Sequence, residues 1–251
     1  MSRKKENQEK QRRKIEQQRA QKRKQHMLTI GTATIVLIFL VFAVIGMVTK
    51  NQDKQGQTSP AAETTHKDPK KVIDYKKQPM LGDKQAPVTI TMFGDYRCIY
   101  CKQFETDILP KLKKDYIDTG KAKFYFINYT ILGQGSEKAA NAAEAILNQY
   151  PDDFWTFNTN LYNKQGPEEK EWVTDDLLVQ VAKASVKHLD VEAFKKDLKD
   201  ETYKSEVEKD VQAGLDLGVQ GTPSVLINNK LVQTPLDYSA IKSLINAALK
   251  K

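Results

Sequence analysis

Cysteine and histidine are scarce in this sequence. Its 251 residues include two Cys and three His, the latter at His26, His66 and His188. Two cysteines exclude a scaffold held by several disulfides and a zinc site with four cysteine ligands. The three histidines are too far apart in sequence to form a close pair of metal ligands. We therefore predict no metal site.

An excess of basic side chains is absent from most of the chain. The formal net charge is +8, but residues 1–27 alone carry eleven Lys or Arg and three Glu, which gives +8. The other 224 residues hold 29 basic and 29 acidic side chains. A protein surface that binds nucleic acid needs a local excess of positive charge. We therefore predict no nucleic-acid partner for the folded part.

One long segment has no charged residue. Residues 27–48 are 22 consecutive uncharged, mostly apolar residues, and a helix of that length is about 33 Å long, enough to cross a bilayer core. A buried helix of a soluble protein is rarely apolar all round at this length. A cleaved signal peptide would have a shorter apolar region, about 7–15 residues, and a small-residue cleavage site. We predict an uncleaved transmembrane anchor.

The charges that flank the anchor predict its orientation. Cytoplasmic flanks of membrane helices carry the excess of Lys and Arg, so the basic tail at residues 1–26 is expected inside the cell. The chain then crosses the cell membrane once and its C-terminal part lies outside. Residues 49–80 are polar and contain Pro60, Pro69 and Pro79, which predicts an extracytoplasmic linker before a folded domain at residues 81–251.

A strand, a helix and a second strand begin the folded domain. Residues 88–93 and 122–129 are rich in β-branched and aromatic residues, as in strands buried on both faces. Between them apolar residues recur every four positions, which predicts a helix that Pro110 should kink. This order predicts a parallel strand pair with a right-handed crossover. The recurring residues are Phe104, Ile108, Leu112 and Tyr116.

Both cysteines lie where this first strand leads into the helix. Free amides and the dipole at a helix N-terminus stabilise a thiolate on the first cysteine, Cys98. Arg97 and Lys102 are expected to add positive charge on either side. A low thiol pKa makes a sulfur both a nucleophile and a good leaving group. We predict Cys98 as the nucleophile and Cys101 as the resolving residue.

The Cys-x-x-Cys spacing could also arise without redox chemistry. A structural disulfide over three residues would close almost no loop and restrain little chain entropy. Half of a zinc site would need two more ligands. Two coincidentally buried thiols are a third possibility. The position between a strand and a helix favours a redox pair over all three.

The C-terminal third contains a proline at the head of a strand. Gly221-Thr222-Pro223 precedes two short apolar runs joined by Asn228-Asn229, which predicts a β-hairpin, and a helix follows at residues 238–250. A proline in this place is either an ordinary trans residue that bounds the strand or a cis residue that turns the backbone towards a neighbouring site. The sequence pattern alone leaves both open.

Residues 129–221 consist mainly of predicted helices. Their acidic run, residues 168–171, could form part of a cation site, but a solvated helix start is favoured because no regular ligand loop is present. An aromatic cluster could line a peptide groove, although a helix-packing core is favoured. The cluster comprises Phe154, Trp155, Phe157, Leu161 and Tyr162.

Taken together, these motifs resemble the DsbA family of thioredoxin-like proteins. The phrase from Phe93 to Cys101 together with Gly221-Thr222-Pro223 carries the resemblance, which covers residues 81–251. It implies an α/β thioredoxin-like fold with a helical insertion at about residues 134–217. With the predicted N-terminal transmembrane helix, the chain is most similar to the membrane-anchored BdbD-type branch.

The resemblance also implies roles for particular residues. Cys98 would be the attacking cysteine and Cys101 its buried partner, with Pro223 as a facing cis-proline and the Thr222 backbone pairing with an extended substrate peptide. The two residues between the cysteines, Ile99 and Tyr100, are expected to tune the redox properties. Many relatives have Pro at the first of these positions, and the well-studied periplasmic enzyme has His at the second.

The sequence as a whole predicts a membrane-anchored, extracytoplasmic thiol-disulfide oxidoreductase that introduces disulfides into exported proteins. The resemblance implies exported protein thiols as substrates, a membrane quinone reductase of the DsbB type as redox partner, and no cofactor beyond the Cys98–Cys101 disulfide. A disulfide reductase or isomerase on the same fold is one alternative. A non-catalytic adaptor that binds extended peptides is another.

Overall fold

A mixed sheet forms the centre of the computed structural model, which describes residues 67–250. The strand order is β1-β3-β2-β4-β5. The two central strands, β2 (Val88–Gly94) and β3 (Ala122–Asn128), are parallel, and both are buried along nearly their whole length. This confirms the predicted parallel pair. The outer strands β1 (Met80–Leu81), β4 (Ser224–Ile227) and β5 (Lys230–Leu231) are antiparallel to their neighbours.

The crossover from β2 to β3 is a helical segment in which two α-helical stretches alternate with two π-helical ones. It runs through α3 (Ile99–Gln103), a π-helix (Phe104–Ile108), α4 (Leu109–Leu112) and a second π-helix (Lys113–Ile117). Pro110 stands in the first turn of α4 and has no amide to donate to the preceding turn. The Leu109 amide bonds to the Phe104 carbonyl, five residues back. The sequence predicts a kink at Pro110, and the structure shows a change from π-helical to α-helical hydrogen bonding there.

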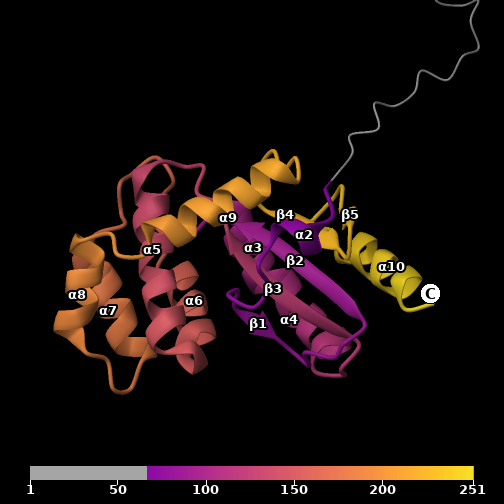
Figure 1. Cartoon of the computed structure of the whole chain (residues 1–251), viewed down its shortest axis with the longest axis horizontal. Coiled ribbons are helices and arrows are strands. Elements are labelled where there is room, and N and C mark those ends of the chain that lie inside the picture. The colour runs from indigo at the N-terminus through magenta and orange to yellow at the C-terminus, as the bar shows by residue number, and fades with distance from the viewer. Residues whose placement is uncertain (1–66, 251) are drawn as a thin grey trace, which may run out of the picture. The chain divides into compact units, whose positions relative to one another are not determined.

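In the described part of the protein, the helices of the insertion group together on one side of the sheet (Figure 1). They bury one another's apolar faces, and the aromatic cluster predicted from the sequence belongs to this core. Phe154, Phe157, Leu161 and Tyr162 are each at most 1% exposed, and Trp155 packs partly buried against them. The helices are α5 (Gln134–Gln149), α6 (Phe154–Asn163), α7 (Asp175–Ser185), α8 (Val191–Lys199) and α9 (Lys204–Asp216), with a 3₁₀ turn (Pro151–Asp153) before α6.

Helix α9 returns the chain from the insertion to the sheet. At Gly214 it approaches the Tyr129 ring so closely that an added Cβ would lie 2.5 Å from a ring carbon, so only glycine fits without displacing the ring. The Tyr129 hydroxyl donates to the Val219 carbonyl at 2.9 Å. The chain then reaches β4 and ends in α10 (Tyr238–Ala248). The predicted C-terminal hairpin and helix are both present.

A buried polar cluster ties β3 to two helices of the insertion. The Asn128 side chain donates to Glu144 of α5 at 2.8 Å, and its backbone amide donates to Asp210 of α9 at 3.1 Å. Gln78 donates to the other oxygen of Asp210 at 2.7 Å. Burial is the main cause that raises the pKa of Glu144 to about 8 and that of Asp210 to about 6.

The folded unit begins earlier than the sequence predicts. Residues 69–80 were expected in the linker, yet they form α2 (Pro69–Val72) and β1, which pairs with β3. Ile73 is buried in an apolar cluster that includes Phe93 and Ile127. Pro69 does not interrupt this helix because it occupies the first turn, where no amide hydrogen bond is required. The linker prediction is therefore wrong at its C-terminal end.

The predicted anchor at residues 27–48 and the basic tail at residues 1–26 lie outside the described residues. Within residues 67–250, no helix is both long and apolar enough to cross a membrane.

Candidate active site

Cys98 stands at the start of α3, just beyond the end of β2. It is the N-cap residue of the helix and has an extended backbone conformation. A tight turn leads into it: Asp95 accepts from the Arg97 amide at 2.8 Å through its side chain and from the Cys98 amide at 3.1 Å through its carbonyl. Such a side-chain-to-backbone turn is typical of Asp after a strand. The sequence thus places Cys98 where free helix amides face its sulfur.

The loop before β4 lies opposite Cys98. Phe93 pairs with Ser224, the first residue of β4, so the preceding Thr222–Pro223 segment comes beside the end of β2. The Thr222–Pro223 peptide bond is cis. The Cys98 Sγ lies 3.3 Å from the Thr222 carbonyl oxygen, to which the thiol donates. The structure therefore brings Cys98, Cys101, Thr222 and Pro223 into one site.

The surroundings of Cys98 favour its thiolate. They lower its pKa to about 6, chiefly through a hydrogen bond from the Cys101 thiol. Burial opposes this shift, and further hydrogen bonds from the Thr222 side chain and the Cys101 and Tyr100 amides add to it. Only 5% of the Cys98 surface is exposed.

Cys101 has the opposite character. It is fully buried, and that burial raises its pKa well above the usual range. The Asp95 amide lies 3.5 Å from its sulfur. Both cysteines are free thiols in the structure. Both sulfurs are buried, but they differ: the surroundings of Cys98 favour its thiolate, whereas Cys101 is held as a thiol that can donate to it.

The two residues between the cysteines are exposed. Ile99 and Tyr100 keep 48% and 54% of their surface accessible to solvent, which is unusual for large apolar side chains in this domain. They lie in the first turn of α3, directly beside Cys98. Side chains here can contact a bound peptide and can alter the electrostatic environment of the thiolate.

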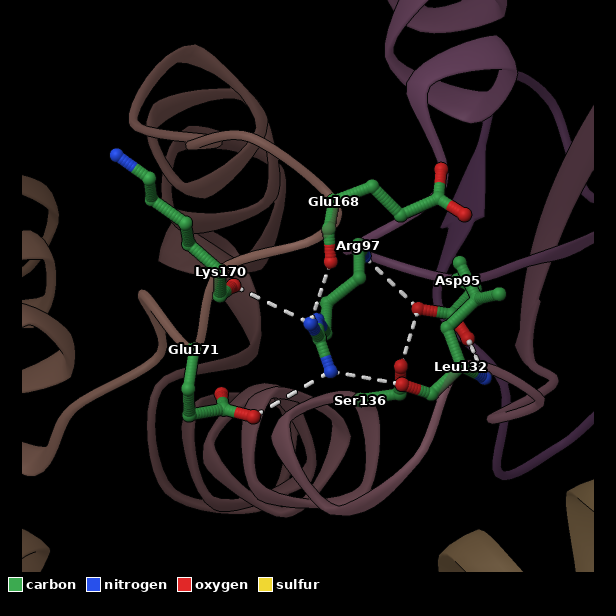
Figure 2. Close-up of polar contacts among 7 residues, drawn as sticks. All are labelled: Asp95, Arg97, Leu132, Ser136, Glu168, Lys170 and Glu171. Atoms are coloured by element: carbon green, nitrogen blue, oxygen red, sulfur yellow. Dashed lines mark hydrogen bonds and ion pairs between the residues drawn. The ribbon is translucent and has the colours of Figure 1, made fainter. Parts of the chain in front are cut away.

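Arg97 does not play the part that its sequence position suggested. Its guanidinium group, expected beside the thiolate, points into a ring of backbone carbonyls (Figure 2). It donates to Leu132 and Glu168 at 2.7 Å each and to Lys170 at 3.2 Å, and it forms an ion pair with Glu171 at 3.4 Å. The hydrogen bonds of Cys101, Thr222 and Tyr100 lower the Cys98 pKa instead.

Asp95 completes this network from the other side (Figure 2). Beyond the Arg97 amide, its carboxylate accepts from the Ser136 hydroxyl at 2.7 Å and from the Ile131 and Leu132 amides at 2.9 and 3.1 Å. The side chain is 1% exposed. Asp95 and Arg97 together fasten the segment after β3 and the loop between α6 and α7 to the residues that precede Cys98.

Three positions of this network were not predicted from the sequence: Asp95, Arg97 in its bonding role, and Gln165, whose side chain donates to the Tyr96 and Cys98 carbonyls. The acidic run at residues 168–171 is a loop rather than the favoured helix start. One available signal was the Asp directly after a buried strand and two residues before an Arg. The partners that both residues find outside this turn lie more than thirty residues away, where no local pattern identifies them.

A pair of cysteines at the start of α3 that faces a cis-proline loop, on this sheet order, defines a thioredoxin-like thiol-disulfide oxidoreductase. The family model described as thioredoxin matches residues 74–247. The chain belongs to this family, and relatives of known structure and name confirm its predicted resemblance to the DsbA-like branch.

Two comparisons with Bacillus subtilis proteins are the basis for the enzyme class. The chain is 44% identical over 175 residues to disulfide bond formation protein D of strain 168, which covers 70% of this chain and 78% of that protein. The crystal structure of oxidised BdbD from B. subtilis matches with a TM-score of 0.68 over 70% of this chain and 95% of that one, at 44% identity. The chain is thus a protein thiol-disulfide oxidoreductase, as predicted.

A more distant structure shares the fold. The crystal structure of Chlamydia trachomatis DsbA matches with a TM-score of 0.62 at 21% identity, over 70% of this chain and 92% of that one.

Within residues 67–250, no group of three or more His, Cys, Asp or Glu side chains is arranged to hold a metal ion.

Proposed function

We propose that this protein introduces disulfide bonds into exported proteins through the Cys98–Cys101 pair. The observation that carries the direction is the contrast between the two sulfurs: the pKa of Cys98 is lowered to about 6, while that of Cys101 is raised by burial. A stabilised Cys98 thiolate favours the reduced enzyme, so the oxidised enzyme is a better oxidant. The relatives named for disulfide bond formation support the same direction.

The exchange proceeds in two displacements. A substrate thiolate attacks Cys98 of the oxidised pair, the bond between the cysteines breaks, and Cys101 leaves and takes up a proton. A second substrate thiolate then attacks the substrate sulfur of the mixed disulfide and releases the Cys98 thiolate. The substrate loses two electrons and two protons, and the enzyme pair gains the two electrons. A low pKa makes Cys98 the better leaving group in the second step.

Substrate binding is assigned to the cis-proline loop. Thr222 and Pro223 lie beside Cys98, and the Thr222 carbonyl already lies 3.3 Å from its sulfur. An extended peptide that adds to this backbone would gain main-chain hydrogen bonds with little dependence on its side chains. The exposed Ile99 and Tyr100 flank the same place and tune both contact and potential.

The location and redox partner rest on the sequence. The uncharged segment at residues 27–48 and the basic tail before it support a single membrane crossing with the domain outside the cell. The enzyme would then need an electron acceptor in the same membrane, for which a quinone reductase of the DsbB type is proposed. Protease added to intact cells should degrade the C-terminal domain and spare the basic tail.

The decisive experiment is the reduction potential of the full-length chain, measured in glutathione buffers. Oxidants of exported proteins lie above about −180 mV, and thioredoxin-like reductants lie near about −270 mV. A value above about −180 mV is expected. A value near that of the reductants would overturn the proposed direction in favour of a reductase, and no reversible exchange at all would favour a peptide-binding adaptor. Cys98→Ser is the matched control, since it removes the redox couple.

A further inference from the structure

Gln165 holds the backbone on either side of Arg97. It lies in the loop between α6 and α7, at residues 164–174, within the helical insertion. Its side-chain amide donates to the Tyr96 carbonyl at 2.7 Å and to the Cys98 carbonyl at 3.0 Å. One polar group from the insertion thus bonds to two peptide groups of the segment that carries the reactive cysteine.

The Cys98 carbonyl has a special position in the helix. It accepts the first two hydrogen bonds of α3, from the Cys101 amide at 3.1 Å and the Lys102 amide at 3.2 Å. The amides of Tyr100 and Cys101, which favour the Cys98 thiolate, belong to the same turn. The direction of the Cys98 carbonyl therefore fixes how that turn, and its amides, face the sulfur.

Arg97 holds the loop that carries Gln165. Its guanidinium group donates to the Glu168 and Lys170 carbonyls, three and five residues beyond Gln165 (Figure 2). The backbone amide of Gln165 also donates to the Tyr162 carbonyl at 3.1 Å, which joins the start of the loop to the end of α6. At Gly166 an added Cβ would lie 2.9 Å from the Trp172 side chain, so the loop packs tightly against its own far end.

These contacts form a closed circuit. Arg97 lies between Tyr96 and Cys98 in the chain, and its side chain bonds to the loop. Gln165 of that loop bonds in turn to the carbonyls of Tyr96 and Cys98. Gln165 is not among the groups that bond to the Cys98 sulfur; those are Cys101, Thr222 and Tyr100. The hydrogen bonds of the Gln165 side chain thus link it to Cys98 through the backbone.

We propose that Gln165 is a positioning residue for thiol-disulfide exchange at Cys98, and that Arg97 supports it by holding the 164–174 loop in place. The proposal deepens the proposed function, on which it rests. Gln165 keeps the Cys98 peptide oriented so that the amides of the first turn of α3 face the sulfur. Loss of the Gln165 amide would let this peptide rotate and would weaken the stabilisation of the thiolate.

The test replaces Gln165 with Met, which has a similar length and no donor. Reduced full-length chain is alkylated with iodoacetamide between pH 4 and pH 9, and mass spectrometry reports the rate at Cys98. Gln165→Met should slow alkylation about threefold at pH 5, where a hydrogen-bond-sized change lowers the thiolate fraction. At pH 9, where Cys98 is ionised in both proteins, the rates should agree. An unchanged pH profile would overturn the proposal.

Gln212→Met is the matched control. Gln212 is an exposed residue of α9 whose side chain donates to Asp216 at 3.1 Å, so it loses a comparable bond far from Cys98 in sequence and should keep the wild-type profile. Gln165→Glu keeps the side-chain length and replaces the donor with an acceptor that faces two carbonyls. It should slow alkylation at pH 5 at least as much as Met does. A wild-type profile for Gln165→Glu would also count against positioning by the amide donor.

Two substitutions of Arg97 separate its holding role from its charge. A Lys cannot reach four acceptors from one planar group, so Arg97→Lys and Arg97→Met should slow alkylation at pH 5 by similar factors, in low and high salt alike. The double variant with Gln165→Met should be no slower than the slower single variant. If Arg97→Lys keeps the wild-type profile, or if the effect disappears in 1 M salt, Arg97 acts by charge and its supporting role is overturned.

The outcome is independent of the direction of electron flow. The alkylation profile reports the thiolate of the reduced enzyme whether that enzyme oxidises or reduces its substrates. A reducing potential with a shifted profile in Gln165→Met would remove the proposed function and keep Gln165 as a positioning residue. An oxidising potential with an unshifted profile would support the proposed function and overturn the positioning role of Gln165.

Discussion

The two halves of this active site are built in different ways. The thioredoxin-like half supplies both sulfurs and the cis-proline loop, and it places them through the β2–β4 pairing and the start of α3. Among the described residues, no group of the insertion forms a hydrogen bond with the Cys98 sulfur. Its Gln165 side chain bonds to the Cys98 backbone, and the backbone of residues 131–132, just before the insertion, bonds to Asp95 and Arg97. The thioredoxin-like half thus supplies the reactive groups, and both halves together hold those groups in position.

This difference predicts how variants should divide. Loss of either sulfur of the first half should alter the chemistry by a large factor and leave the fold intact. Changes in the contacts between the halves should lower stability or shift the thiolate by modest factors. A variant whose effect crossed from one class to the other would break this division.

The largest effect is expected at the sulfurs. Cys98→Ala should abolish turnover in a dithiol oxidation assay, because no sulfur remains for the substrate to attack. Cys101→Ala cannot form the Cys98–Cys101 disulfide and should also lose dithiol oxidation, but its Cys98 thiolate should attack added oxidised glutathione, release one glutathione thiolate and remain as a mixed disulfide, because the resolving thiol is gone. Mass spectrometry of the purified variant would detect the adduct. Both variants should melt within a few degrees of the reduced wild type, and full turnover by Cys98→Ala would refute the assigned role.

The next largest effect is expected at Asp95, which joins the halves. Asp95→Ala removes an acceptor of four hydrogen bonds at a buried site and should lower the free energy of unfolding by about 3 kcal/mol. Urea denaturation followed by tryptophan fluorescence measures this loss.

Asp83→Ala provides the control for Asp95. Asp83 makes the same kind of turn, accepting from the Gln85 amide at 2.8 Å, but at an exposed site. Its loss should cost less than about 1 kcal/mol. Equal losses at the two positions would mean that Asp95 does no more than make a local turn.

The sequence predicts the first half far better than it predicts the second. Strand periodicity, the Cys-x-x-Cys spacing and the Thr222–Pro223 segment are local patterns, and each led to a site residue that the structure brings together. The contacts that Asp95, Arg97 and Gln165 make between the two halves join residues 35 to 74 positions apart. Their acceptors are mostly backbone carbonyls, which every residue has, so no side-chain pattern marks them.

The start of the folded unit shows the same limit. Residues 69–80 look like linker because prolines and charged residues dominate them. Ile73 nevertheless packs with Phe93 and Ile127, and Tyr75 bonds to the Thr91 hydroxyl at 2.9 Å. The burial of Ile73, the Tyr75–Thr91 bond and the pairing of β1 with β3 together hold a segment whose own composition does not predict folding. Tertiary burial decides such segments, and local propensity does not.

The pH dependence of stability tests the thiolate itself. In the reduced protein the pKa of Cys98 is lowered to about 6, whereas that of a cysteine in an unfolded chain is about 8.5. The stability that the thiolate contributes is therefore fully present above pH of about 8.5 and is lost as the pH falls through about 6. The oxidised protein lacks this group.

The melting temperature of the reduced protein, minus that of the oxidised protein, should therefore fall by several degrees from pH 8.5 to pH 5. Calorimetry of both forms measures the difference. Cys98→Ser should abolish the part of the pH dependence that is specific to the reduced state. A difference that stays constant over this range would contradict the lowered pKa.

The smallest effect is expected at Tyr100, which belongs to the reactive half but touches solvent. Tyr100 is 54% exposed in the first turn of α3, so an imidazolium placed there should favour the neighbouring thiolate through space without disturbing the packing. Tyr100→His should increase the fraction of Cys98 thiolate at pH 5 about threefold and make the potential more oxidising by about 15 mV, since a tenfold change corresponds to about 30 mV. Tyr100→Phe is the control, because it adds no charge and should match the wild type. If Tyr100→Phe shifted the profile as far as Tyr100→His, the Tyr100 hydroxyl would itself be positioning the Cys98 thiolate. The thioredoxin-like half would then also contain positioning residues, contrary to the division proposed here.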